Sequence, residues 1–183
     1  NIISRKADGY HNIETLFYPI GLKDALEIIP SEASEHRFYP DGMEVTGSDE
    51  ENLVMKALRL VEKERTLPPI DIHLLKKIPS GAGVGGGSSD AAFMLKLLNQ
   101  TFRLDFSPDE LTKMAASLGA DCAFFIHNKP ALATGIGDIL EPVDIDLSSY
   151  FLLLVKPPIA VSTKEAYSMI VPQKPEVPLR EII

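Results

Sequence analysis

The feature that most constrains this chain is a glycine-rich stretch at residues 79–92, which reads P-S-G-A-G-V-G-G-G-S-S-D-A-A. Its glycines stand at positions 81, 83, 85, 86 and 87, and three polar residues follow them directly. Glycine has no Cβ and adopts positive φ angles readily, so such a run can bring successive backbone N–H groups close to a ligand. The stretch is therefore expected to bind a ligand through backbone N–H groups.

A helix is expected directly after the glycines. Its apolar face is predicted to contain Phe93, Met94, Leu97 and Leu98. Its N-terminal cap is expected among the polar residues Ser88, Ser89 and Asp90. A glycine loop that leads into a helix N-terminus is an anion site, because unpaired amides and the helix dipole both point at the ligand. The pattern therefore predicts a cradle for the phosphates of a nucleotide triphosphate.

Three other interpretations of the glycines are weaker. A flexible linker is polar on both sides, whereas Ile70–Leu75 alternates apolar and polar residues like a half-buried strand. A Walker loop would end in Gly-Lys-Ser/Thr, and no such lysine closes this stretch. The spacing of Gly81, Gly83 and Gly86 fits a dinucleotide fingerprint, but no matching acidic position completes the βαβ unit.

Composition narrows the function classes further. The chain has 183 residues, of which 45% are apolar and 24% charged, so it can bury a globular core. Its formal charge of −8 argues against a nucleic-acid binder, which needs a basic face. The single cysteine, Cys122, excludes a disulfide framework and is typical of a reducing compartment. No apolar run reaches membrane-spanning length, so no membrane partner is expected.

The remaining patterns predict mixed α and β structure. Helices are expected over 52–64, over 108–118 behind the capping box Ser107–Glu110, and over 162–170. A hairpin is predicted around Gly135 and Gly137, and the apolar run Phe151–Val155 is expected to be a fully buried strand. Further strands are expected at 1–3, 13–20, 25–29, 37–39 and 43–46.

Four motifs in order along the chain resemble those of the GHMP kinases, which include galactokinase, homoserine kinase and mevalonate kinase. They are A-D-G-Y-H at 7–11, the glycine stretch, L-G-A-D-C-A-F-F at 118–125 and A-T-G-I-G-D at 133–138. The resemblance implies an α+β fold with an N-terminal domain like domain 2 of ribosomal protein S5, expected here at 1–143. Residues 144–183 are then expected to begin a ferredoxin-like C-terminal domain, with the active cleft between the two domains.

The G-G-G-S-S-D-A-A ending resembles one branch of this family, whose members phosphorylate a cytidine diphosphate derivative of methylerythritol on the route to isoprenoids. The implied activity is that of a cytoplasmic small-molecule kinase that uses ATP and Mg²⁺ and is a monomer or homodimer. Another GHMP kinase, or a nucleotide-binding fragment without turnover, is the alternative. The family's catalytic lysine is expected before Asn1, which leaves the activity of this chain alone open, and Lys6 and Lys23 are not substitutes for it.

The resemblance also implies site residues. Asp121 is the expected general base, which takes a proton from the acceptor hydroxyl; from its sequence context alone, a helix-end hydrogen-bond acceptor is an equal alternative. The stretch expected to bind ATP consists of Pro79, Gly81, Ala82, Gly83, Val84, Gly85, Gly86, Gly87, Ser88 and Ser89. The two serines carry hydroxyls that suit phosphate or Mg²⁺, and the residues that ligate the metal are not identified.

Three aromatic residues are expected at the cytidine end of the substrate. In the related branch the counterpart of Tyr10 stacks on cytosine, the counterpart of His11 hydrogen-bonds to it, and an aromatic residue similar to Tyr167 covers the other face. Without the resemblance, Asp8-Gly9 predicts only a turn, and Tyr167 is a candidate for ordinary core packing. Asn52 is expected mainly as a helix cap, and no functional role is predicted for His36, His73, His127 or Cys122.

Overall fold

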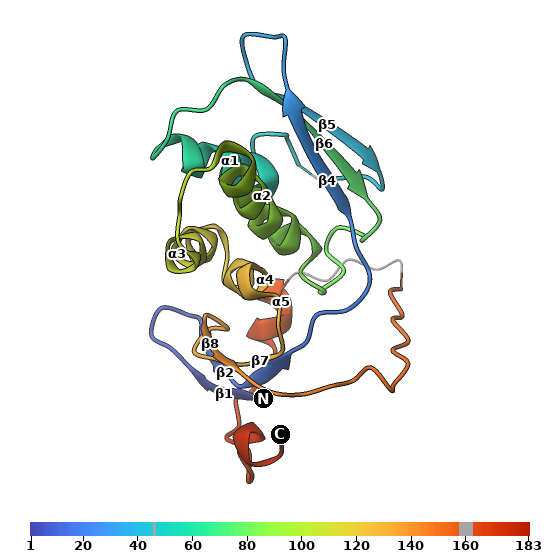
Figure 1. Cartoon of the computed structure of the whole chain (residues 1–183). Coiled ribbons are helices and arrows are strands. Elements are labelled where there is room, and N and C mark those ends of the chain that lie inside the picture. The colour runs from blue at the N-terminus through green and yellow to red at the C-terminus, as the bar shows by residue number, and fades with distance from the viewer. Residues whose placement is uncertain (46, 158–162) are drawn as a thin grey trace. The chain divides into compact units, whose positions relative to one another are not determined.

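The computed structural model describes residues 1–45, 47–157 and 163–183, and it divides into two compact units. One unit is continuous, Ile20–His127, and the other combines Asn1–Pro19 with Asn128–Ile183. Helices and strands occur in both (Figure 1), which confirms the predicted α+β class. The expected domain boundary after residue 143 stays a prediction, because a division of this chain into compact units does not test it.

The continuous unit is built on a three-stranded sheet. Its strands are β4 (Ala25–Pro30), β5 (Arg37–Gly42) and β6 (Ile70–Lys76). β6 is the central strand and pairs antiparallel with β4 and parallel with β5. β6 has a paired strand at each edge, and five of its seven residues are buried. The C-terminal end of this strand leads directly into the glycine stretch.

Four helices complete the described part of this unit, and α1 (Leu53–Glu62) and α2 (Gly86–Phe102) cover one face of the sheet (Figure 1). The two short helices α3 (Pro108–Leu118) and α4 (Cys122–His127) lie beside α2. α3 begins with the predicted capping box, in which Ser107 accepts from the Glu110 amide and Glu110 accepts from the Ser107 amide. The core between helices and sheet consists of Val54, Leu58, Val61, Ile70, Ile72, Leu74, Met94, Leu95 and Leu98.

The discontinuous unit contains short strands. β1 (Ile2–Arg5) pairs with β2 (His11–Ile13), and β3 (Thr15–Phe17) pairs with β7 (Ala131–Thr134), which also pairs with β8 (Ile139–Pro142). β7 and β8 form the predicted hairpin around the two glycines. A short helix α5 (Thr163–Ser168) and a 3₁₀ turn (Leu179–Glu181) follow.

Three expectations about strands and buried residues are wrong. Residues 43–45 form no strand, and residue 46 lies outside the described chain. On α2, Phe93 is exposed and Leu95 is buried, because the inward face of the helix follows Ala91, Met94, Leu95 and Leu98. Phe151–Val155 is neither a strand nor buried, and all five side chains are exposed.

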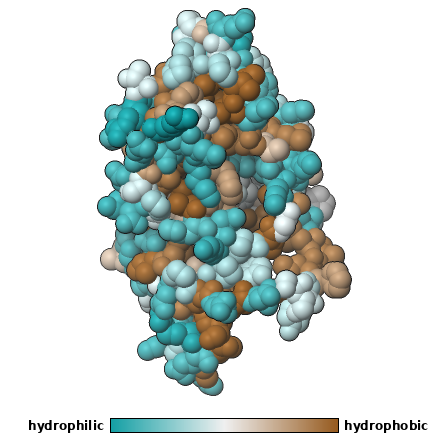
Figure 2. Space-filling view, viewed as in Figure 1, coloured by the Kyte–Doolittle hydropathy of each residue, from teal (hydrophilic) through white to brown (hydrophobic). Residues whose placement is uncertain are grey.

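The apolar run fails as a strand for a physical reason. A strand needs a neighbour to pair its backbone groups and a layer to cover its side chains. Among the described residues no strand pairs with Phe151–Val155. Figure 2 shows hydrophobic side chains at the surface where Figure 1 places this segment. A periodic or apolar pattern therefore indicates what a segment can bury, and only a partner decides whether it does.

Candidate active site

The glycine loop connects the end of β6 to the N-terminus of α2. Gly81, Gly83 and Gly85 have φ angles of 67°, 74° and 70°, which side chains rarely adopt. Gly85 is the N-cap, and no side chain caps the helix; Ser88, Ser89 and Asp90 lie inside α2 instead, so the predicted capping is wrong. The extra glycines extend the helix backwards, which propensity alone would not suggest.

This geometry leaves backbone donors available. The first helical hydrogen bond joins the Ser89 amide to the Gly85 carbonyl, 2.8 Å apart. The amides of residues 86, 87 and 88 precede that bond and have no intrahelical acceptor. They lie at the positive end of the helix dipole. The arrangement is suited to bind an anion, and the assignment of the individual loop residues to ATP stays a prediction.

The loop packs against α4 and against the end of β6. A Cβ on Gly85 would lie 2.9 Å from the Phe125 ring, and one on Gly86 would lie 2.9 Å from Ile78. Lys96 of α2 donates a hydrogen bond to the Ile126 carbonyl at 3.2 Å. The Cys122 thiol contacts the Ser88 hydroxyl, and burial raises the pKa of this thiol. The loop, α2 and α4 are therefore one packed assembly within the continuous unit.

Asp121 lies immediately before α4, next to the residue that contacts Ser88. Among the described residues, no hydrogen bond or ion pair to its carboxylate exists. The alternative of a helix-end acceptor is therefore not supported. The side chain reaches solvent, but the protein around it excludes enough water to raise the pKa of its carboxyl group. A carboxylate without a partner is free to accept a proton, as a general base must.

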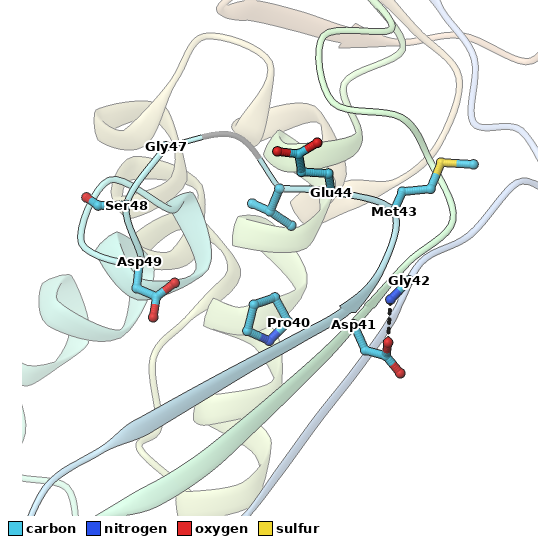
Figure 3. Close-up of a pocket in the computed structure, with 9 residues that line it drawn as sticks. Pro40, Asp41, Gly42, Met43, Glu44, Gly47, Ser48 and Asp49 are labelled. Atoms are coloured by element: carbon cyan, nitrogen blue, oxygen red, sulfur yellow. Dashed lines mark hydrogen bonds between the residues drawn. The ribbon is translucent and has the colours of Figure 1, made fainter.

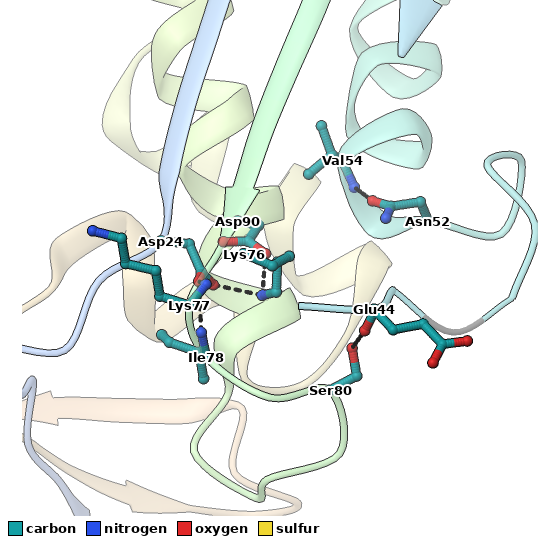
Figure 4. A network of polar contacts seen from close by, with 9 residues as sticks. All are labelled: Asp24, Glu44, Asn52, Val54, Lys76, Lys77, Ile78, Ser80 and Asp90. Atoms are coloured by element: carbon teal, nitrogen blue, oxygen red, sulfur yellow. Dashed lines mark hydrogen bonds and ion pairs between the residues drawn. The ribbon is translucent and has the colours of Figure 1, made fainter. Parts of the chain in front are cut away.

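A buried ion cluster beside the loop was missed by sequence reasoning. Lys76 lies between Asp24 and Asp90, with its Nζ atom 2.5 Å and 2.8 Å from their carboxylate oxygens (Figure 4). All three side chains are at most 8% exposed. Lys76, directly after the apolar strand residues, was the signal in the sequence that could have predicted the cluster, because a buried cation needs carboxylate partners. Asp90 was expected to be a cap, which concealed its role here.

A hollow of about 260 Å³ lies next to the loop in the same unit. It is lined by residues 40–45 and 47–49, and Figure 3 shows the side chains that surround it, with the Gly42 amide bonded to the Asp41 carboxylate. Ser80 of the glycine loop donates to the carbonyl of Glu44, one of the lining residues, at 3.3 Å (Figure 4). The hollow is therefore connected to the loop by a direct hydrogen bond.

The three aromatic residues expected at cytidine lie in the discontinuous unit. The Asp8-Gly9 turn forms as predicted, with the Tyr10 amide donating to the Asp8 carboxylate at 3.1 Å. Tyr10 is 61% exposed, whereas His11 is buried. The His11 and Tyr167 rings lie together, with centroids 5.2 Å apart and planes tilted by 40°. The structure thus brings His11 to Tyr167 and leaves Tyr10 open to solvent.

Asn52 has the capping role expected of it, and three histidines make contacts within the described chain. Asn52 caps α1 by accepting from the Val54 amide. His36 bonds to Glu62, His73 stacks on Tyr39, and His127 contacts Thr112. Within the described ranges no three His, Cys, Asp or Glu side chains cluster as metal ligands. In the same ranges no helix is long and apolar enough to cross a membrane.

Comparison with known proteins gives consistent results. Residues 52–129 match the family model described as GHMP kinases N terminal domain. The chain is 56% identical to the 4-diphosphocytidyl-2-C-methyl-D-erythritol kinase of Parabacteroides distasonis over 183 residues, which are all of this chain and 67% of that protein. It is also 56% identical to the kinase of the same name from Bacteroides fragilis (strain ATCC 25285), covering all of this chain and 68% of that protein.

A solved structure agrees with these relatives. The crystal structure of a 4-(cytidine 5'-diphospho)-2C-methyl-D-erythritol kinase superposes with a TM-score of 0.76 at 30% identity. The superposition covers 98% of this chain and 63% of that one. The chain thus spans about two thirds of the length of the relatives that it matches.

Proposed function

Because this chain belongs to the 4-diphosphocytidyl-2-C-methyl-D-erythritol kinases of the GHMP kinase family, we propose that it transfers the γ-phosphoryl group of ATP to the 2-hydroxyl of 4-diphosphocytidyl-2-C-methyl-D-erythritol. The reaction belongs to the route to isoprenoid precursors. The observation that carries the proposal is the contact between the glycine loop and the start of α4. Gly85, at the N-terminus of α2, packs against Phe125 of α4, the helix that Asp121 directly precedes, so the anion site and Asp121 belong to one packed assembly.

The amides of Gly86, Gly87 and Ser88 hold the phosphates of ATP. They point out of the N-terminus of α2, where the helix dipole favours negative charge. No lysine closes the loop, so backbone donors carry a larger share of phosphate binding here than in a Walker site. Catalysis of phosphoryl transfer depends mostly on positioning and on charge stabilisation, and a rigid row of amides supplies both.

Asp121 is the general base. The acceptor oxygen attacks the γ-phosphorus, its proton passes to a carboxylate oxygen of Asp121, and the bond from the γ-phosphorus to the bridging oxygen breaks. ADP leaves with that electron pair. A raised pKa suits this role, because a carboxylate that binds protons more tightly is the stronger base.

Mg²⁺ is expected to enter with ATP, since this ion keeps most of its water and needs only one or two protein oxygens besides the phosphates. The hydroxyls of Ser88 and Ser89, in the first turns of α2, are oxygen donors of the required kind. When bound, the ion would neutralise charge on the phosphates. The hollow lined by residues 40–45 and 47–49 is the proposed place for the nucleoside of ATP, because Ser80 of the phosphate loop donates a hydrogen bond to Glu44 in its lining.

The A-D-G-Y-H turn is proposed to bind the cytidine end of the substrate. Tyr10 offers an exposed ring face for stacking. His11 is held against Tyr167, which orients its imidazole to hydrogen-bond a base edge. We expect the protein to work in the cytoplasm as a monomer or homodimer.

A turnover assay tests the proposal. ATP with the cytidylyl substrate should give ADP and a phosphorylated product, whereas homoserine or mevalonate in its place should give none. Turnover with homoserine or mevalonate would favour another GHMP kinase. Nucleotide binding without turnover by this chain, alongside turnover by the full-length enzyme, would assign it as a nucleotide-binding fragment.

A further inference from the structure

The Asp24–Lys76–Asp90 cluster lies where the chain enters and leaves the glycine loop. Lys76 is the last residue of β6, and its side chain is 4% exposed. One Asp24 oxygen binds Lys76 Nζ, while the other accepts from the amides of Lys77 and Ile78 at 2.5 Å and 2.8 Å. Asp24 therefore accepts hydrogen bonds from three consecutive residues at the end of β6, Lys76, Lys77 and Ile78. Asp24 thereby fixes the direction in which the chain enters the loop.

Asp90 fixes the other end of the loop. It lies on α2, five residues after the Gly85 cap, and its carboxylate binds the same Lys76 Nζ at 2.8 Å. The first residue of α2 packs directly on the strand exit, because a Cβ on Gly86 would lie 2.9 Å from Ile78 and 3.5 Å from Lys76 Nζ. The cluster thus links residues 76–78 to α2. Residues 79–85 form a loop whose two ends are held together by this link.

Burying the three charges of the cluster costs desolvation free energy. Burial acts against the Lys76 cation, and its hydrogen bonds to Asp24 and Asp90 still raise its pKa. Burial raises the pKa of Asp90 to about 6, despite its contact with Lys76. Apolar residues often stabilise an interior as well as such a cluster does. What ion pairs add is a fixed geometry, because their hydrogen bonds set the distance and direction between two segments.

Lys76 is also unavailable for direct phosphate binding. Its ammonium group is enclosed and bound by two carboxylates, so it does not act as the lysine that the loop lacks. Its effect on a nucleotide must pass through the backbone that it positions.

We propose that Asp24, Lys76 and Asp90 are positioning residues for nucleotide binding, which hold the two ends of the glycine loop together so that the amides of residues 86–88 keep their alignment toward the phosphates. The inference rests on the proposed function, since it assigns the alignment of the phosphate-binding amides to a cluster whose three side chains are buried.

The test uses the 183-residue chain, with Mg·ADP as the probe in calorimetry. Asp90→Ala removes the link to α2 while Lys76 keeps Asp24 as its partner, so no buried cation is left unpaired. We expect at least a tenfold loss of Mg·ADP affinity. Asp90→Asn, which keeps an acceptor of the same size, should recover most of that loss. The matched control is Asp71→Ala, which removes the partner of Arg37 from the same strand β6 without touching the loop.

Hydrogen exchange separates positioning from a general structural role. In Asp90→Ala, amide exchange should become faster in residues 79–89, while exchange in α1 and β6 should stay at the wild-type rate. If the variant folds and binds Mg·ADP within twofold of wild type, or if faster exchange spreads through α1 and β6, the inference is wrong. Should Asp90→Ala not fold, Lys76→Met combined with Asp90→Leu takes its place, because this pair removes both opposite charges together.

The two hypotheses fail in different ways. A wild-type chain that does not bind Mg·ADP contradicts the proposed function. In that case the exchange measurement still reports whether the cluster orders the loop.

Discussion

Gly85 lies directly against the ring of Phe125, so close that a Cβ on this glycine would be 2.9 Å from two ring carbons. Its φ of 70° is also one that a side chain would strain. Phe125 belongs to α4, the helix that Asp121 precedes. The contact therefore couples the position of the phosphate loop to that of the proposed base, and a residue other than glycine at 85 would disturb both.

The first prediction concerns close approach to the loop. Gly85→Val and Gly86→Val should abolish ATP binding, because their side chains meet Phe125 and Ile78 and displace the amides. Gly87→Ala is the sharper test, since its Cβ would meet only Leu53 at an ordinary 3.7 Å and the fold should be kept. We expect at least tenfold weaker ATP binding by calorimetry, with an unchanged melting temperature.

Gly21→Val is the control for these variants. It lies in the same unit, and a Cβ there meets nothing within 4 Å. Wild-type ATP affinity in all of the loop variants would show that the loop does not bind the nucleotide.

The second prediction concerns proton transfer. Asp121→Asn keeps the shape of the side chain but cannot accept the proton from the hydroxyl. In the full-length enzyme kcat should fall roughly 10²–10⁴-fold, the usual range for lost general-base catalysis. The KM values for both substrates should change little. A variant with nearly wild-type kcat would remove Asp121 from the mechanism.

The third prediction is a pH dependence of the rate. Asp121 is active only when ionised, and desolvation raises its pKa above the ordinary 3.8. As the pH falls through that raised pKa, the carboxylate binds a proton and kcat/KM should decline. The acid limb should therefore lie above pH 3.8 in the wild type and be absent from the residual activity of Asp121→Asn. An identical acid limb in both proteins would assign it to another group.

The fourth prediction links the same carboxylate to stability. An acid whose pKa is raised by folding favours the folded state when it is protonated, so its ionisation destabilises the fold as the pH rises above the unfolded value. Above the raised pKa the full cost is present, and Asn at 121 avoids it. Asp121→Asn should thus melt at a higher temperature than wild type at neutral pH, and the difference should vanish below pH 3.8. A lower melting temperature at neutral pH would contradict this.

The sequence predicts best where local rules act alone. The capping box at Ser107, the Asn52 cap and the hairpin after Ala131 are each determined by a few adjacent residues, and each is confirmed. The glycine stretch was located correctly for the same reason. Its helix was started too late, because the favourable N-terminus uses glycines that the propensity scale disfavours.

What the sequence could not give depends on contacts between distant residues. Asp24 and Lys76 are 52 residues apart, and no spacing rule joins them. The packing of Phe125 on Gly85 likewise joins two residues that no spacing rule connects. For Phe151–Val155 the sequence predicted a structure that does not form. Its pattern is that of a buried strand, but no strand in the described chain pairs with it.

The last prediction concerns the cytidine end of the substrate, and it rests on the contrast between two adjacent residues. Tyr10 is 61% exposed and contributes little to the fold, whereas His11 is buried against Tyr167. Tyr10→Ala should therefore leave the melting temperature unchanged. It should raise KM for the cytidylyl substrate by an amount equal to about 1–3 kcal/mol, the usual value of a base–aromatic stack. KM for ATP should stay nearly the same.

His11 should act on selectivity instead. A hydrogen bond to a base edge discriminates between bases where stacking does not, so His11→Asn should narrow the preference for cytidylyl over uridylyl substrates. Tyr150→Ala is the control for Tyr10→Ala, because Tyr150 is 69% exposed in the same unit and belongs to none of the motifs. The decisive comparison is between the two substrates of the Tyr10→Ala enzyme. If KM for ATP rises as much as KM for the cytidylyl substrate, the A-D-G-Y-H turn serves the nucleotide donor or the fold, and its assignment to cytidine is wrong.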